Sequence, residues 1–212
     1  GGWFMKASIK GYDFKRGSQH NFAHIDLWCV ILAGTRALTK GLVGLNHDWM
    51  EDWARVLTFD ALIGNTDRHH ENWGFLMSRA GSPPQVRLQL APAFDNGTSL
   101  GHERPESQFP RFEQVEYLQG YIRKGHHHMR WHQHDPHQAG FIELLLGLLK
   151  KYPQCRPVIQ DVLKFDAVKL EAAVMELTGL ELPVPLSEAR ARFMLRLVLA
   201  RRDALWKALP QS

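Results

Sequence analysis

The sequence predicts a mostly α protein with one small β element. Apolar residues recur at helical spacing in the first third of the chain and again after residue 140. Between these parts, two extended runs flank a turn rich in glycine and proline. With 212 residues, of which 44% are hydrophobic and 23% charged, the chain is long enough for one domain with one core. This composition excludes disordered, collagen-like and coiled-coil proteins.

The first part of the chain contains one predicted strand and two predicted helices. Residues 3–10 alternate in polarity, as a strand does, and residues 12–21 form a polar loop. The apolar stretch 25–38 predicts a helix. A second helix begins at Asp48, which precedes a glutamate by three residues as in a capping box, and it ends at Gly64. Its apolar stripe consists of Trp49, Trp53, Val56, Leu57 and Ala61.

The chain then continues as loop, strand, turn, strand and loop. A polar stretch at 65–72 is followed by an apolar run at 73–77, a Gly-Ser-Pro-Pro turn at 81–84, and an extended run at 86–94 that closes at Asp95.

Few apolar positions are periodic over residues 98–140, which predicts a long excursion with one short helix near residues 112–122. The remainder is predicted to be helical, with Pro, Asp, Ser or Gly at the boundaries, where these residues cap or stop helices. The four predicted helices cover residues 141–152, 157–163, 166–179 and 187–209.

Charge and cysteine content indicate which partners and which cellular compartment suit the protein. A formal net charge of +4 permits acidic or phosphorylated partners without requiring them. Cys29 and Cys155 lie far apart and outside any metal-binding spacing, which indicates a reducing compartment. No apolar run is long enough to span a bilayer, and the first residues lack the layout of a signal peptide. We therefore expect a soluble, cytoplasmic protein that does not interact with membranes.

Three polar residues around the β element have the spacing of a kinase catalytic centre. Asn72 follows Asp67 by five residues, and Asp95 opens an Asp-Asn-Gly string 23 residues after Asn72. Such a loop directs a carboxylate toward the acceptor hydroxyl and an amide oxygen toward Mg²⁺, and the hairpin then returns a second carboxylate to the metal. Each residue alone is a common turn former, but the set predicts phosphoryl transfer.

Two strings, FDALIGNTDRHHENWGFL at residues 59–76 and LAPAFD at residues 90–95, carry a family resemblance. The chain from Trp53 to Leu100 resembles the C-terminal lobe of HipA-like serine/threonine kinases, the toxins of bacterial toxin–antitoxin modules. This resemblance implies a protein-kinase-like C-lobe fold, ATP and Mg²⁺ as cofactors, a protein Ser or Thr as acceptor, and an antitoxin as a partner.

The resemblance also implies roles for four residues. Asp67 would be the catalytic aspartate and His69 a catalytic-loop histidine, while Asn72 and Asp95 would bind Mg²⁺ and, through it, the nucleotide. The Asp-Asn-Gly string at Asp95 is also similar to that of phosphatidylinositol 4-kinases and secretory-pathway kinases. A lipid or small-molecule acceptor is therefore an alternative at the same site.

We expect residues 1–45 to form a strand and helix segment that is a remnant of, or a linker from, an N-terminal lobe. Residues 46–212 are expected to be the kinase C-lobe, with a catalytic loop at 64–77, a metal loop at 90–101 and C-terminal helices at 141–209. Only 66 residues precede the catalytic aspartate, and no G-x-G-x-x-G string occurs. We therefore expect a fragment, or one half of a split kinase whose N-lobe is a separate partner protein.

A rival catalytic string occurs at residues 97–101, where Gly-Thr-Ser-Leu-Gly matches the nucleophile elbow of α/β-hydrolases. The residues after it are a poor helix opening, and no alternating series of strands and helices surrounds it. We interpret Ser99 as part of the loop that follows the metal aspartate.

Six histidines crowd into residues 126–137. On a helix, His128 with His132, or His134 with His137, would share a face and could bind Zn²⁺. The proline and the polar residues among them favour a solvated loop instead.

The last predicted helix carries basic residues opposite an apolar side. We interpret them as the solvated face of a packed helix, because they are spread out and lack an aromatic platform. Direct binding to nucleic acid is therefore not expected. These residues are Arg190, Arg192, Arg196, Arg201, Arg202 and Lys207.

These patterns together predict the C-lobe of a HipA-like kinase that transfers the γ-phosphate of ATP to a protein hydroxyl with Mg²⁺, and that needs an N-lobe to do so. The alternative from another class is a non-catalytic kinase-fold module that binds or regulates a partner.

Overall fold

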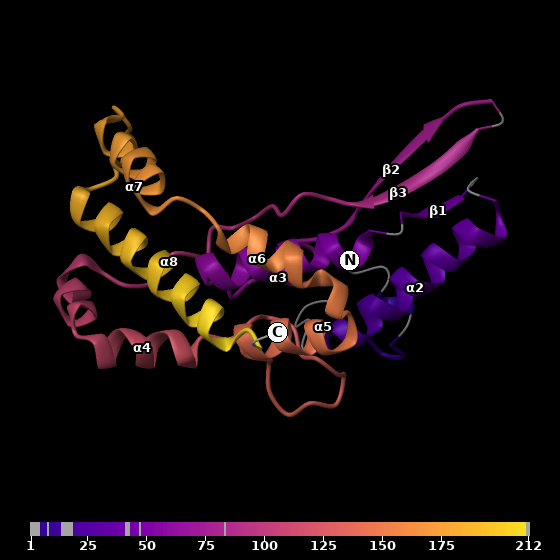
Figure 1. Cartoon of the computed structure of the whole chain (residues 1–212), viewed down its shortest axis with the longest axis horizontal. Coiled ribbons are helices and arrows are strands. Elements are labelled where there is room, and N and C mark those ends of the chain that lie inside the picture. The colour runs from indigo at the N-terminus through magenta and orange to yellow at the C-terminus, as the bar shows by residue number, and fades with distance from the viewer. Residues whose placement is uncertain are drawn as a thin grey trace.

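The computed structural model describes residues 5–7, 9–13, 19–40, 43–46, 48–82 and 84–210. Helices form most of this part, and three short strands form one sheet (Figure 1). The predicted mostly α fold with a small β element is confirmed. None of the helices in these ranges is long and apolar enough to cross a membrane. The helices are α2 (Phe22–Leu38), α3 (Trp49–Ile63), α4 (Val115–Lys124), α5 (Phe141–Lys151), α6 (Arg156–Leu163), α7 (Ala167–Glu176) and α8 (Glu188–Ala208), with 3-10 turns η1 (Glu106–Glu113), η2 (Pro153–Cys155) and η3 (Leu177–Gly179).

The sheet contains β1 (Val43–Leu45), β2 (Phe75–Ala80) and β3 (Gln85–Leu90), in the order β1-β3-β2. The antiparallel strands β2 and β3 are the predicted hairpin, and they project from the helical body (Figure 1). β1 runs parallel to β3 and is not among the predicted elements. A strand of three residues that pairs far along the chain leaves no periodic signal in its own sequence.

α3 lies at the centre of the core. It packs against α5, α6 and α8, and Trp53 and Ala61 of its predicted apolar stripe are buried. The ring of Trp53 meets that of Phe22 at a centroid distance of 5.7 Å and that of Trp73 at 5.2 Å, both steeply inclined. Aromatic contacts therefore connect α2, α3 and the segment that precedes β2.

A second, smaller cluster anchors the start of the long excursion after β3. Phe109 stacks on Phe193 of α8 with ring centroids 4.1 Å apart, and Phe112 meets the same ring edge-on at 4.9 Å. The cluster continues onto α4, which confirms the short helix predicted near residues 112–122. The excursion is therefore packed against α8 at its beginning.

Side-chain caps explain where several helices begin. Asn21, Asp166 and Ser187 accept backbone N–H groups in the first turns of α2, α7 and α8, respectively. The predicted starts of α7 and α8 are thus confirmed. The predicted cap at Asp48 is wrong, because its side chain makes no capping hydrogen bond and its backbone (φ −87°, ψ 9°) is not extended as an N-cap usually is.

The strand predicted over residues 3–10 is wrong for the described part of that range. Residues 5–7 are helical, and the Ile9 N–H donates to the Met5 carbonyl at 2.9 Å. Met5 and Ile9 are both buried, because a spacing of four residues places them on the same side of a helical turn. Residues 1–4 and 8 lie outside the described residues.

Gly64 ends α3 as predicted, and two features of the structure require glycine there. Its φ is +67°, and a Cβ would lie 2.2 Å from Nη2 of Arg201. We expect Gly64→Ala to lower the free energy of unfolding by about 2 kcal/mol, since the left-handed conformation alone costs non-glycine residues roughly 1–2 kcal/mol. Urea denaturation measures this loss. The control is Gly34→Ala in α2, where a Cβ meets open space and the variant should be at least as stable as the wild type. Equal losses in both variants would contradict the prediction.

Candidate functional site

The loop after α3 holds Asp67 by its backbone. The Asp67 N–H donates to Oδ1 of Asn65 at 3.0 Å. The Asp67 carbonyl accepts from the His69 N–H and from Nδ2 of Asn72, each at 2.8 Å. The half-buried side chain of Asp67 takes no part in these bonds. The backbone is therefore fixed on both sides of Asp67, while the Asp67 carboxylate remains available for a ligand.

The next residue, Arg68, is buried and forms a two-pronged ion pair with Asp60 of α3. Nε lies 3.0 Å from Oδ2 and Nη2 lies 2.7 Å from Oδ1, and both side chains are 0% exposed. His127 brings its Nε2 to 3.1 Å from the same carboxylate. Burial by itself raises the pKa of the Asp60 carboxyl, but the hydrogen bonds from His127 and Arg68 outweigh it, so this pKa lies below its usual value. Asp60 is therefore ionised at neutral pH.

Arg68 also joins the loop after α3 to the loop after β3. Its Nη1 donates to the carbonyls of Asn72, at 3.0 Å, and of Phe94, while Nη2 donates to Oδ1 of Asn96 at 2.6 Å. Phe94 and Asn96 are the two neighbours of Asp95 in the chain. One guanidinium therefore brings together the segments that carry Asn72 and Asp95.

Asp95 has a φ of +53°, which is uncommon in residues other than glycine. Such a conformation persists only where the surroundings fix it, and here Arg68 fixes both neighbours of Asp95. The Asp95 side chain is exposed. Asn72 uses its amide nitrogen on the Asp67 carbonyl, which leaves its amide oxygen available. A carboxylate and an amide oxygen are the hard ligands that Mg²⁺ prefers, so this donor pair fits magnesium.

His69 belongs to a group of four imidazole rings beside the loop. Its Nδ1 accepts the Glu71 N–H at 3.1 Å, and its ring centroid lies 5.8 Å from that of His70 and 6.0 Å from that of His128. His20 completes the group at 6.3 Å from His70 and 5.7 Å from His128. Burial and the neighbouring imidazoles lower the pKa of His128 to about 4 and the pKa of His20 well below its usual range. These two rings are therefore neutral at pH 7, and they contribute to the packing of the neighbouring rings.

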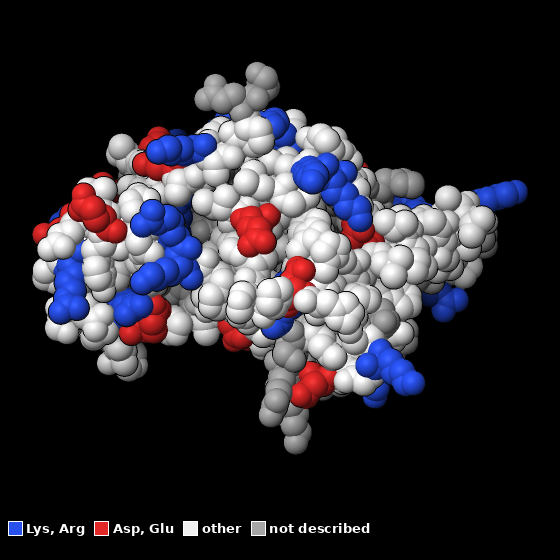
Figure 2. All heavy atoms as spheres, turned by 90° about the horizontal axis from the view of Figure 1, so that it is seen from below, with Lys and Arg blue, Asp and Glu red and all other residues white. Residues whose placement is uncertain are grey.

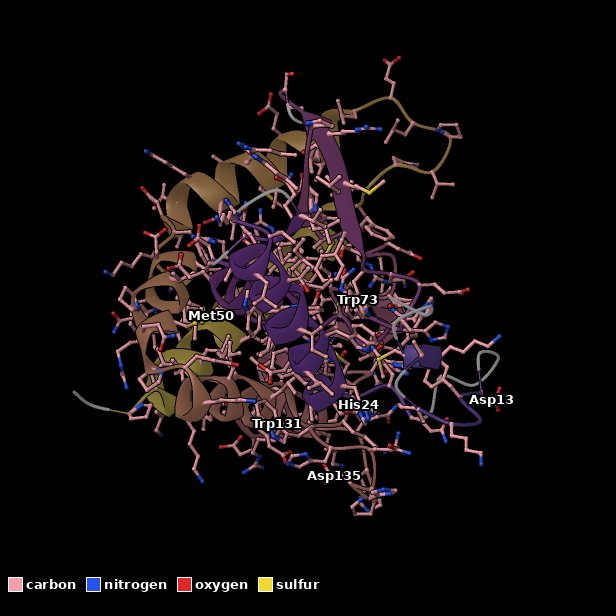
Figure 3. The ribbon with its side chains drawn as sticks, turned by 90° about the vertical axis from the view of Figure 1, so that its right-hand side faces the viewer. Asp13, His24, Met50, Trp73, Trp131 and Asp135 are labelled. Carbon is pink, nitrogen blue, oxygen red and sulfur yellow. The ribbon has the colours of Figure 1, made fainter. Side chains whose placement is uncertain are left out.

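Trp73 connects this group to the core. Its Nε1 donates to Nε2 of His20 at 3.0 Å, and the two rings stack at an interplanar angle of 14°. Figure 3 views the protein from this side, with Trp73 labelled above His24 of α2. The residue directly after Asn72 is thus held in the interior, which limits how far the loop can move.

The histidine-rich segment is a loop, as predicted, because residues 125–140 form isolated bridges and no helix. The interpretation as solvated surface is wrong for His127, which is buried, and for His128, which is half-buried. Backbone hydrogen bonds join this loop to the start of α2, and Figure 3 shows Trp131 and Asp135 at that end of the helix. Within the described ranges, no three His, Cys, Asp or Glu residues are grouped so that they could hold a metal ion.

Three basic residues of α8 do not belong to a solvated face, which corrects that interpretation for them. The side chain of Arg202 is 22% exposed, and its guanidinium carbon lies 5.0 Å from the ring centroid of Phe165. Arg201 is 6% exposed. Arg190 is half-buried and donates to the carbonyls of Gly101, at 3.1 Å, and Arg104, at 2.6 Å. Arg192 is exposed, as expected.

Ser99, the serine of the elbow-like string, donates its Oγ–H to the Asn96 carbonyl at 2.6 Å. The structured element that follows it is the 3-10 turn η1, which begins at Glu106. A nucleophile elbow requires a helix directly after the serine. Ser99 therefore stabilises the loop after Asp95.

Comparison with solved structures shows what this arrangement resembles. The crystal structure of the Helicobacter pylori proinflammatory kinase CtkA matches with a TM-score of 0.54 and 19% sequence identity, over 77% of this chain and 54% of that chain. The chain has a kinase-like fold. It spans about half the length of that kinase. No family model and no curated protein matches the sequence.

Sequence reasoning missed Asp60, Arg68 and His127, which position the two loops. A signal existed for Asp60, because it lies beside Ala61 on the buried side of α3, and an ionisable residue there needs a buried partner. Arg68 is the first cation that follows Asp60 along the chain. His127 gave no such signal, because it is 67 residues away from Asp60 in sequence.

Proposed function

We propose that this chain is the C-lobe of a HipA-like serine/threonine kinase, which transfers the γ-phosphoryl group of ATP to a protein hydroxyl with Mg²⁺. The observation that carries the proposal is the position of Arg68, whose guanidinium binds the backbone of Asn72 and both neighbours of Asp95. The kinase-like fold supports the same class of reaction.

Each residue has a role in this proposal. Asp67 orients the acceptor hydroxyl and accepts its proton, because a fixed loop presents its carboxylate and the hydrogen bonds of that loop do not use it. Asn72 and Asp95 would hold Mg²⁺, which when bound neutralises negative charge on the phosphates. His69 keeps the loop in shape by accepting the Glu71 N–H.

Phosphoryl transfer also needs a covering loop and a lysine for the nucleotide phosphates. We propose that an N-lobe supplies both, either in the same polypeptide or as a separate protein. An antitoxin partner and a cytoplasmic location complete the HipA-like proposal.

Binding of Mg²⁺-ATP tests the metal residues. With the N-lobe supplied, Asp95→Asn should weaken binding of Mg²⁺-ATP at least about tenfold, because a neutral amide is a poorer ligand for a hard cation. Isothermal titration calorimetry with and without Mg²⁺ measures the change. The matched control is Asp161→Asn on the exposed side of α6, which should bind like the wild type. Unchanged Mg²⁺-ATP affinity in Asp95→Asn would remove Asp95 from the site.

A further inference from the structure

A cavity of about 390 Å³ lies beside the catalytic loop. Gly64 and Thr66 of that loop line it, together with Thr98 of the loop after β3 and residues of α4 and α8. Thr66 directly precedes Asp67 in the chain. Successive Cα atoms are about 3.8 Å apart, so the cavity lies close to Asp67. In an acceptor protein whose hydroxyl is held at Asp67, a side chain only a few residues from that hydroxyl can therefore enter the cavity.

The cavity is lined by Arg201, a buried arginine whose nearest acidic influence is Glu103, also in the lining. One guanidinium nitrogen donates to the Ile63 carbonyl at 2.9 Å, and the guanidinium carbon lies 5.8 Å from the ring centroid of Tyr121. In the part of the chain that the structure describes, no carboxylate forms an ion pair with it. A guanidinium carries five N–H donors, so most of this group's capacity remains for a ligand. Burial lowers the pKa of Arg201 despite the nearby Glu103, so its charge is incompletely compensated, and an anion in the cavity would relieve this.

Two further cations line the same cavity. Arg104 pairs with Glu103 at 3.1 Å, and Glu103 also accepts the Tyr121 hydroxyl at 2.8 Å. Lys124 of α4 forms no ion pair with any carboxylate of the described residues. The lining thus contains three cations and one carboxylate, and that carboxylate is already engaged.

The segment that carries Arg104 is held in place. Arg190 of α8 donates to the carbonyls of Gly101 and Arg104. Figure 2 shows several Lys and Arg side chains, with Asp and Glu side chains among them, at the end of the molecule where α4 and α8 lie. The excess of cations in the cavity is therefore held in a fixed arrangement that attracts an acidic group.

We propose that this cavity binds an anionic side chain of the acceptor protein, a carboxylate or a phosphoryl group located a few residues from the Ser or Thr that is phosphorylated. Both groups match the donors of Arg201, Arg104 and Lys124. The proposal rests on the proposed kinase function, and it gives that function a substrate class: acidic or already phosphorylated segments.

Peptide binding tests the proposal separately from catalysis. Three fluorescent peptides of equal length, each with one central serine, carry glutamates, a phosphoserine or glutamines at the flanking positions, and fluorescence anisotropy gives their affinities. We expect the two anionic peptides to bind about tenfold or more tightly than the glutamine peptide, with affinity that falls as salt rises. The comparison of glutamate with phosphoserine identifies the preferred group.

The variants use surface cations, because Arg201 packs against Gly64 and its replacement could disturb the fold. Lys124→Ala and Arg104→Ala should each remove most of the preference for anionic peptides. Arg192→Ala, which removes an exposed charge elsewhere on α8, should retain it. An equal affinity for all three peptides, or a preference that survives in both cavity variants, would overturn the proposal. If the protein prefers anionic peptides but no phosphoryl transfer occurs when an N-lobe is supplied, the anion-binding cavity is supported and the proposed kinase function is refuted.

Discussion

Asp67→Asn is expected to reduce phosphoryl transfer by about a hundredfold or more, which is typical of the loss of a positioned general base. The asparagine keeps the size of the side chain, and the backbone bonds to Asn65, His69 and Asn72 that fix the loop do not involve the carboxylate. Affinity for Mg²⁺-ATP should therefore change little. The assay follows labelled phosphate from ATP into protein Ser and Thr, with the N-lobe supplied in cis or in trans.

The matched control is Asp166→Asn, because asparagine caps a helix about as well as aspartate and the Asp166 side chain accepts the N–H groups of Val168 and Lys169 in the first turn of α7. It should transfer phosphate at the rate of the wild type. A wild-type rate in Asp67→Asn would remove this residue from the mechanism. Absence of transfer in the wild-type complex would instead favour the alternative function, a non-catalytic module that binds or regulates a partner.

Local patterns were sufficient for most of the fold. The helices from α3 onward follow from apolar spacing and from boundary residues such as Asp166, Ser187 and Gly64, because capping and left-handed ends depend on adjacent residues alone. The errors arose where distant contacts decide. The polarity of residues 3–10 alternates loosely, as in a strand. A pair four residues apart, such as the buried Met5 and Ile9, shares one face of a strand as well as of a helix, so this pattern does not distinguish the two, and the bond from the Ile9 N–H to the Met5 carbonyl shows a helical turn.

In the candidate site, too, the residues set by local spacing could be predicted from the sequence, whereas those set by distant contacts could not. The spacing of Asp67, Asn72 and Asp95 could be read directly, since a loop and a hairpin fix it. The ion pair that aligns the two loops could not, because Arg68 reaches partners on both sides of the hairpin, the farthest of them 28 residues away. His127 likewise looked like part of a solvated tract, and only its contact with Asp60 shows that it belongs to the interior.

Asp60→Asn is expected to lower the stability of the protein more than Gly64→Ala does. It leaves the guanidinium of Arg68 buried without its counter-ion, and breaking a buried pair in this way costs about 3–5 kcal/mol of unfolding free energy. Urea denaturation measures the loss. The control is Glu51→Gln, which breaks the half-exposed Glu51–Arg55 pair at 3.3 Å and should cost less than about 0.5 kcal/mol.

The dependence on pH distinguishes loss of charge from loss of packing. Because the pKa of Asp60 is lower in the folded state than in the unfolded state, its contribution is present at neutral pH and is lost as the pH falls through the folded-state pKa. The difference in stability between wild type and Asp60→Asn should therefore be largest near pH 7 and should shrink in acid. A difference that stays constant down to strongly acidic pH would show that Asp60 stabilises the fold by shape alone. In that case, Arg68 would not be held by charge, and the alignment of the two loops would need another explanation.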